Sequence, residues 1–100
     1  MIEVRNLAQF KRFLATPGAT VTMIEHSAFE QMRPEKRDEM FGPRTVRKLQ
    51  TNSVQFSNGG WLHFGKASDW TFENDTATCR VAAREGYRDE LKMVYRLEVK

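Results

Sequence analysis

The residue types that most often carry chemistry are sparse in this chain, which has two histidines, His26 and His63, and a single cysteine, Cys79. Neither histidine belongs to a Cys-x-x-Cys, His-x-His or closely spaced carboxylate pattern, so a metal site would need ligands gathered by the fold alone. Cys79 and His63 could form a nucleophile and base. However, Cys79 lies on the apolar side of an alternating strand, where a thiol is usually inert packing. We therefore expect no metal and no reactive thiol.

The acidic and glycine-rich stretches also lack the spacing of a catalytic site. Asp69, Glu73 and Asp75 flank a predicted hairpin, where such residues serve turn geometry, and acid–base work would require a shared pocket. The glycines at 59–60 and at 65 lack the strand, the glycine–lysine spacing and the helix that a phosphate loop requires. The sequence therefore predicts a protein that is not an enzyme and uses no cofactor.

Aromatic rings and cations form the pattern that predicts binding. Both tryptophans, a histidine and a lysine lie within residues 61–70, and further cations lie within residues 33–48. This mixture is typical of single-stranded nucleic-acid binders, although tryptophan is more often a core anchor. Trp61 and His63 share one strand parity and Leu62 and Phe64 the other, so one of these pairs is expected to be exposed. The candidate binding residues are Arg33, Lys36, Arg37, Arg44, Arg47, Lys48, Trp61, His63, Lys66 and Trp70.

Length and charge limit the class of protein. The chain has 100 residues, which predicts a single domain, and 40% of them are apolar. Its net charge of +3 arises in residues 1–50, which hold nine basic and six acidic residues. The basic segment 33–48 could contact phosphates or an acidic protein surface, and the alternative is a solvated loop. With no signal peptide, no membrane-spanning run and one cysteine, we expect a cytoplasmic protein that does not contact membranes.

Capping and periodicity predict an N-terminal helix followed by a strand. Asn6 can cap the helix, with Gln9 as the reciprocal partner of a capping box, and Lys11 and Arg12 are expected to face away from the core. The apolar face of this helix consists of Leu7, Phe10, Phe13 and Leu14. The β-branched run after it predicts a strand over residues 19–26.

The middle of the chain is harder to assign. Residues 27–43 predict a long charged insertion loop that contacts a partner, with one or two helical turns starting at Pro34. The alternative is a plain surface loop whose Phe29 and Phe41 tuck under the core. Residues 44–56 predict one long strand with a bulge or bend at 49–52.

The C-terminal half predicts an antiparallel meander with turns at 57–60 and 74–75. Two strands alternate over residues 76–84 and 91–99. Their apolar faces consist of Ala77, Cys79, Val81 and Ala83 in the first and Leu91, Met93, Tyr95 and Leu97 in the second. The predicted fold class is therefore α+β, with the N-terminal helix packed on a strongly twisted, mostly antiparallel sheet of about six strands.

Several short segments resemble a family of small uncharacterised proteins of bacteriophages and other bacterial mobile elements. They are residues 7–14 (LAQFKRFL), 21–26 (VTMIEH), 48–56 (KLQTNSVQF), 61–64 (WLHF) and 66–68 (KAS). The resemblance covers most of residues 7–75 and supplies no active-site residues. It implies a phage or integrated-element genome, in which proteins of this size often inhibit host defence or bind nucleic acid.

Two functions follow as expectations. The first is a stoichiometric inhibitor of the anti-CRISPR or anti-restriction type, which would occupy a surface of a host defence protein or ribonucleoprotein nuclease complex through residues 33–48. The second is an RNA or single-stranded DNA binding module that uses the basic and aromatic residues. A structural role in the phage is a further alternative. We expect a monomer or homodimer in the bacterial cytoplasm.

Overall fold

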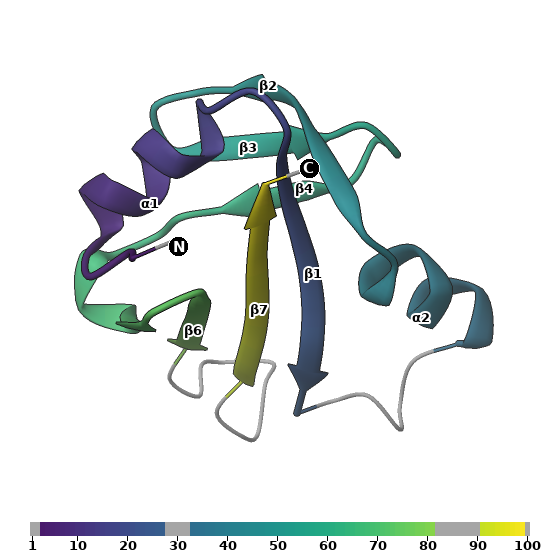
Figure 1. Ribbon diagram of the computed structural model, residues 1–100. Helices are drawn as coiled ribbons and strands as arrows, with labels where there is room; N and C mark the ends of the chain where they lie inside the picture. Colours follow the sequence, from purple (N-terminus) through teal and green to yellow (C-terminus); the bar gives the residue numbers. More distant parts are fainter. Residues whose placement is uncertain (1–2, 28–32, 82–90, 100) are drawn as a thin grey trace.

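The computed structural model describes residues 3–27, 33–81 and 91–99 and shows an α+β fold (Figure 1). These residues form the helices α1 (Leu7–Leu14) and α2 (Pro34–Phe41) and a 3-10 turn, η2 (Ala67–Asp69). The strands are β1 (Ala19–His26), β2 (Arg44–Leu49), β3 (Ser53–Phe56), β4 (Trp61–His63), β5 (Trp70–Glu73), β6 (Thr76–Val81) and β7 (Leu91–Val99). The predicted fold class is confirmed, with one strand more than expected.

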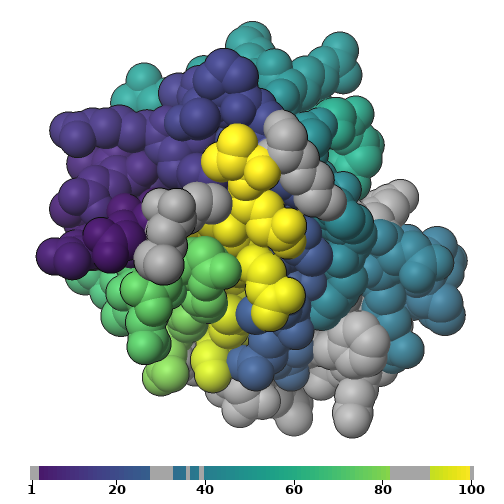
Figure 2. All heavy atoms as spheres, in the orientation of Figure 1, coloured from purple at the N-terminus to yellow at the C-terminus, as the bar shows by residue number. Residues whose placement is uncertain are grey.

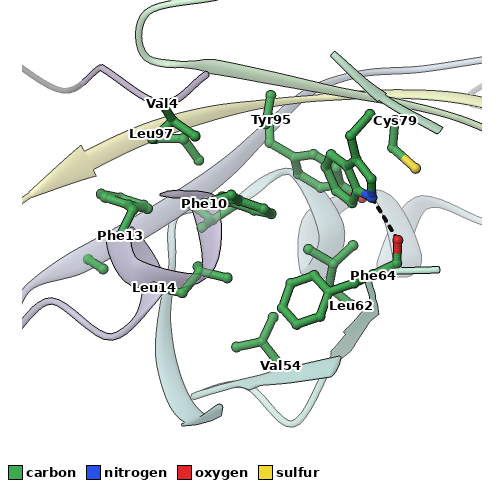
Figure 3. Packing of buried hydrophobic residues seen from close by; sticks show 14 of the residues in the cluster. Val4, Phe10, Phe13, Leu14, Val54, Leu62, Phe64, Cys79, Tyr95 and Leu97 are labelled. Atoms are coloured by element: carbon green, nitrogen blue, oxygen red, sulfur yellow. Dashed lines mark hydrogen bonds between the residues drawn. The ribbon is translucent and has the colours of Figure 1, made fainter. Parts of the chain in front are cut away.

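The strands form one antiparallel sheet of seven in the order β4-β3-β2-β1-β7-β6-β5. Its two edge strands, β4 and β5, are consecutive in the chain and are joined by residues 64–69. A sheet whose edges are linked by so short a segment must curl, which the natural twist of strands favours. Trp70 Nε1 donates a hydrogen bond of 2.7 Å to the Phe64 carbonyl oxygen (Figure 3), so the start of β5 is tied to the end of β4.

Helix α1 begins at the predicted cap. The Gln9 N–H donates to Asn6 Oδ1 at 2.9 Å, and the reciprocal bond runs from the Arg5 N–H to Gln9 Oε1 at 2.7 Å, one residue earlier than in a standard capping box. The expectation that Lys11 faces away from the core is wrong. Its Nζ donates to the Thr51 carbonyl oxygen at 3.0 Å, so the side chain joins the helix to the β2–β3 turn.

The Phe10 side chain lies where the two edges of the sheet meet. It is completely buried, and its ring centroid lies 5.2 Å from that of Trp70, 5.7 Å from that of Phe72 and 6.1 Å from that of Phe64. Figure 3 shows α1 directing its apolar residues toward the inner sides of strands that flank this core. Helix α1 therefore covers the opening left between β4 and β5.

The charged segment before β2 is partly helical. Strand β1 occupies the predicted residues, and the helical turns predicted from Pro34 onward form α2, which fills about half of the segment 27–43. Met40 and Phe41 pack against the core, as one alternative expected for Phe41. Residues 28–32, with Phe29, lie outside the described residues.

Residues 44–56 form a hairpin, so the prediction of one long strand is wrong. The Gln50 N–H donates to the Ser53 carbonyl oxygen at 2.8 Å, which turns the chain, and β2 and β3 pair through Val46 with Phe56 and Leu49 with Val54. The polar residues at 50–52 are the turn itself. The bend predicted at 49–52 is therefore the place where the chain turns, and a separate register shift lies between Val46 and Lys48.

The side of β7 that faces the core is the side that the alternation of the sequence predicts. Tyr95 and Leu97 are 2% and 1% exposed, whereas Arg96 between them is exposed. Figure 2 shows the outer side of β7 running between β1 and β6. In β6 the inward residues Ala77 and Cys79 are buried as predicted, and Ala83 lies outside the described residues.

Candidate functional site

Strand β4 presents its two aromatic side chains on the outer side of the sheet. Trp61 is 45% exposed and His63 is also exposed, whereas Leu62 and Phe64 are in the core. The Trp61 and His63 rings are stacked, with centroids 6.5 Å apart and planes inclined by 14°. Trp70 does not join them. It is 5% exposed in the core, so the prediction that Trp70 contributes to a binding surface is wrong.

A row of outward-pointing side chains crosses the strands β2, β3 and β4. Lys48 of β2 pairs with Gln55 of β3, and Gln55 pairs with Trp61 of β4, so a cation, an amide and an indole lie side by side in the register. Paired residues in a sheet point to the same side. We call this surface the β2–β4 face, and define it by Thr45, Lys48, Gln55, Trp61 and His63.

The β2–β4 face is formed by a stretch of chain without acidic residues. Residues 40–68 contain no Asp or Glu but four Lys or Arg. Three of these, Arg47, Lys48 and Lys66, are exposed, with Arg47 next to Lys48 in β2 and Lys66 just before η2. This local excess of positive charge favours an anionic partner.

The remaining predicted cations belong to a different element. Lys36 lies in α2, which is preceded by the exposed Arg33. Arg37 is half-buried beside a hollow of about 630 Å³ that Asp38 and Phe41 also line. The segment 33–48 is divided between two elements, the helix α2, which contacts β1, and the strand β2.

Arg44 is buried, so the prediction that it is a surface binding residue is wrong. It is 7% exposed at the start of β2, on the inner side of the sheet, and its guanidinium carbon lies 4.2 Å from the centroid of the Phe56 ring. Burial lowers the pKa of Arg44. Arg44 has the parity of the inward-facing Val46, and this is the sequence signal that indicates its position.

The histidine–cysteine hypothesis has no geometric support. Cys79 lies on the inner side of β6 and His63 on the outer side of β4. Burial raises the pKa of the Cys79 thiol to about 11, with a smaller contribution from Asp69, so the thiol is protonated at neutral pH. In the described parts of the chain, no three His, Cys, Asp or Glu side chains gather into a possible metal site.

The protein is therefore a small α+β protein with a curled antiparallel sheet. Helix α1 covers the opening between β4 and β5, and the β2–β4 face is basic and aromatic. Comparison with protein-family models, curated proteins and solved structures finds no match for the chain. Neither helix among the described residues is long and apolar enough to cross a membrane.

Proposed function

We propose that this protein is a non-enzymatic binding protein that holds single-stranded RNA or DNA on the β2–β4 face. The observation that supports this proposal most strongly is the exposed Trp61–His63 pair on a surface built from acid-free chain. Exposed rings offer stacking surfaces to any base, and neighbouring cations neutralise phosphates. Bases in a duplex are already stacked on each other, so a single strand fits this face better.

The row Lys48–Gln55–Trp61 supports the same ligand class. A base stacked on Trp61 places its strand over Gln55 and Lys48, because the register sets these residues side by side. The amide can bond a base edge or sugar, and the ammonium can neutralise a phosphate. Lys66 extends the positive charge beyond the end of β4.

Replacing Trp61 with alanine is expected to weaken binding of a labelled single-stranded oligonucleotide by roughly 5- to 150-fold, the loss that corresponds to one stacked base. Fluorescence anisotropy at low salt measures the two dissociation constants. The matched control is Ile24→Ala, because Ile24 is 42% exposed on β1, away from the face. This control should bind as tightly as the unchanged protein.

Salt dependence provides the decisive part of this test. Each neutralised phosphate of a single strand contributes about 0.7 to the slope of log affinity against log salt concentration, so Lys48→Gln should flatten that slope by about this amount. If the unchanged protein fails to bind any oligonucleotide at low salt, or if Trp61→Ala and Ile24→Ala bind alike, the proposal is refuted.

The second candidate is a stoichiometric inhibitor of a host defence nuclease complex, acting in a phage or mobile-element setting. The observation that favours it is the exposed tryptophan, since Trp is enriched among residues that dominate protein interfaces. Tagged protein expressed with candidate anti-phage complexes should retain its target, and Trp61→Ala should lose it. Failure to bind, or to protect phage from, any of these complexes would exclude this candidate.

A further inference from the structure

A groove lies where the turn between α1 and β1 separates from strand β2. It has a volume of about 360 Å³, and its apolar lining includes Leu14, Pro17, Ala19, Val46 and Leu49. This volume falls within the range of roughly 300–1,000 Å³ that is typical of ligand pockets. None of the described side chains that line the groove is charged. The half-buried side chains of Val46 and Leu49 therefore present apolar surface to a space that the described chain leaves open.

Both walls of the groove are held in place by hydrogen bonds of the protein itself. In the turn, the Thr16 N–H donates to the Phe13 carbonyl oxygen at 2.9 Å, and the Ala19 N–H donates to the Thr16 carbonyl oxygen at 3.1 Å. On the other side, Val46 and Leu49 belong to the ladder between β2 and β3. The groove is therefore formed before a ligand binds, which lowers the entropic cost of binding.

The strand beside the groove has an open side. The ladder between β1 and β2 consists of the pairs Thr20–Thr45 and Val21–Arg44. Residues 46–49 continue along β3, but no described strand pairs with them on the β1 side. A strand with an open side can accept an extended peptide, whose side chains enter pockets beside it. This arrangement favours an extended segment as the occupant.

The charge around the groove indicates an acidic occupant. The two stretches that supply its walls, residues 4–24 and 40–68, contain seven Lys or Arg and no Asp or Glu. Arg12 of α1 and Arg47 of β2 are exposed. The Glu98 carboxylate belongs to β7, two strands away from β2. Cations in both wall elements attract carboxylates and reject basic partners.

We propose that this groove binds an extended acidic peptide segment of a partner protein. One apolar side chain of that segment enters the groove, its backbone follows β2 beyond Thr45, and flanking carboxylates face Arg12 and Arg47. The buried apolar side chain contributes most of the affinity, and the charges contribute specificity. In the described part of the chain, Thr45 is the one lining residue that also belongs to the β2–β4 face. The inference therefore does not rest on nucleic-acid binding.

Selection from a random linear peptide library displayed on phage tests this proposal. The enriched peptides should share an apolar residue flanked by Asp or Glu. A synthetic peptide with that shared sequence should bind more weakly as salt concentration rises, because exposed charges are screened. In an NMR titration, the same peptide should shift the methyl signals of Val46 and Leu49, which line the groove.

A variant that fills the groove locates the bound peptide. Ala15 is an exposed lining residue at the end of α1, so Ala15→Trp should obstruct the groove and weaken peptide binding at least about tenfold. The matched control is Ala8→Trp, because Ala8 is exposed near the start of α1 and does not line the groove. This control should bind the peptide like the unchanged protein.

Charge reversal provides a second measurement, which carries the test if Ala15→Trp does not fold. Arg12→Glu should weaken peptide binding roughly two- to tenfold, as expected for the loss of an exposed ion pair and the gain of a repulsion. Its control is Arg96→Glu, since Arg96 is exposed on β7, outside the groove. Equal affinities for these two variants would contradict an acidic peptide in the groove.

Further outcomes separate this groove from the proposed function. Trp61→Ala should leave peptide binding unchanged, and Ala15→Trp should leave oligonucleotide binding unchanged, so each site can fail alone. The inference is overturned if no peptide is enriched, if the enriched peptides are basic, or if Ala15→Trp and Ala8→Trp bind the peptide alike. Binding of dodecanoate without any enriched peptide would assign the groove to an anionic amphiphile and would also overturn it.

Discussion

Replacing Phe10 with alanine is expected to lower the free energy of unfolding by about 3–5 kcal/mol, as for other fully buried phenylalanines. The ring touches Phe64 after one edge strand and Trp70 and Phe72 in the other, so its removal leaves a cavity at the place where the two edges meet. A domain of this size is stable by only about 5–15 kcal/mol, so the loss is a large fraction of the total. Chemical denaturation with a fluorescence readout of the tryptophans measures it.

Arg12→Ala is the matched control for this experiment. Arg12 lies on the same helix but is exposed, so this replacement should change the free energy of unfolding by less than about 0.5 kcal/mol. Equal denaturation midpoints for Phe10→Ala and Arg12→Ala would show that α1 does not cover the opening between β4 and β5.

Leu97→Ala is expected to cost about 2–5 kcal/mol of stability. Leu97 is 1% exposed and pairs with Val21, which is fully buried, at the centre of the sheet. The adjacent Arg96 points to the opposite side, between Thr22 and Thr76, and is exposed. A shift of one residue in this strand would bury charged side chains in place of apolar ones, which would cost several times more than a surface change.

Arg96→Ala should therefore change stability by less than about 1 kcal/mol. The two variants differ by one position in one strand, so their denaturation midpoints report directly on which side of β7 faces the core. A lower midpoint for Arg96→Ala than for Leu97→Ala is the result that would contradict the described register.

Capping, β-branched runs and apolar alternation predicted those elements that depend on neighbouring residues alone. The cap at Asn6, the β-branched run of β1 and the alternation that buries Tyr95 and Leu97 depend on residues within the element, so they could be predicted. The sequence predicted a bend near 50–52 but not the full reversal of a hairpin, because the turn contains neither glycine nor proline and is closed by a bond from the Gln50 N–H to the Ser53 carbonyl oxygen.

The composition of the β2–β4 face could not be predicted without the curvature of the sheet. Trp61 and Trp70 are alike by residue type, and only the pairing of β4 with β3 and of β5 with β6 places the first outside and the second inside. Arg44 belongs to a basic segment, which predicts a surface position, whereas its parity with the inward-facing Val46 indicates the buried position that the structure shows.

The position of β7 in the sheet has a consequence for how fast the chain folds. Strand β1 pairs with β2 through two described residue pairs, whereas its longer ladder is with β7, which lies far along the sequence. The two halves of the sheet are therefore joined mainly by contacts of long sequence separation. Such contacts form slowly, so we expect the pairing of β1 with β7 to be a late step of folding.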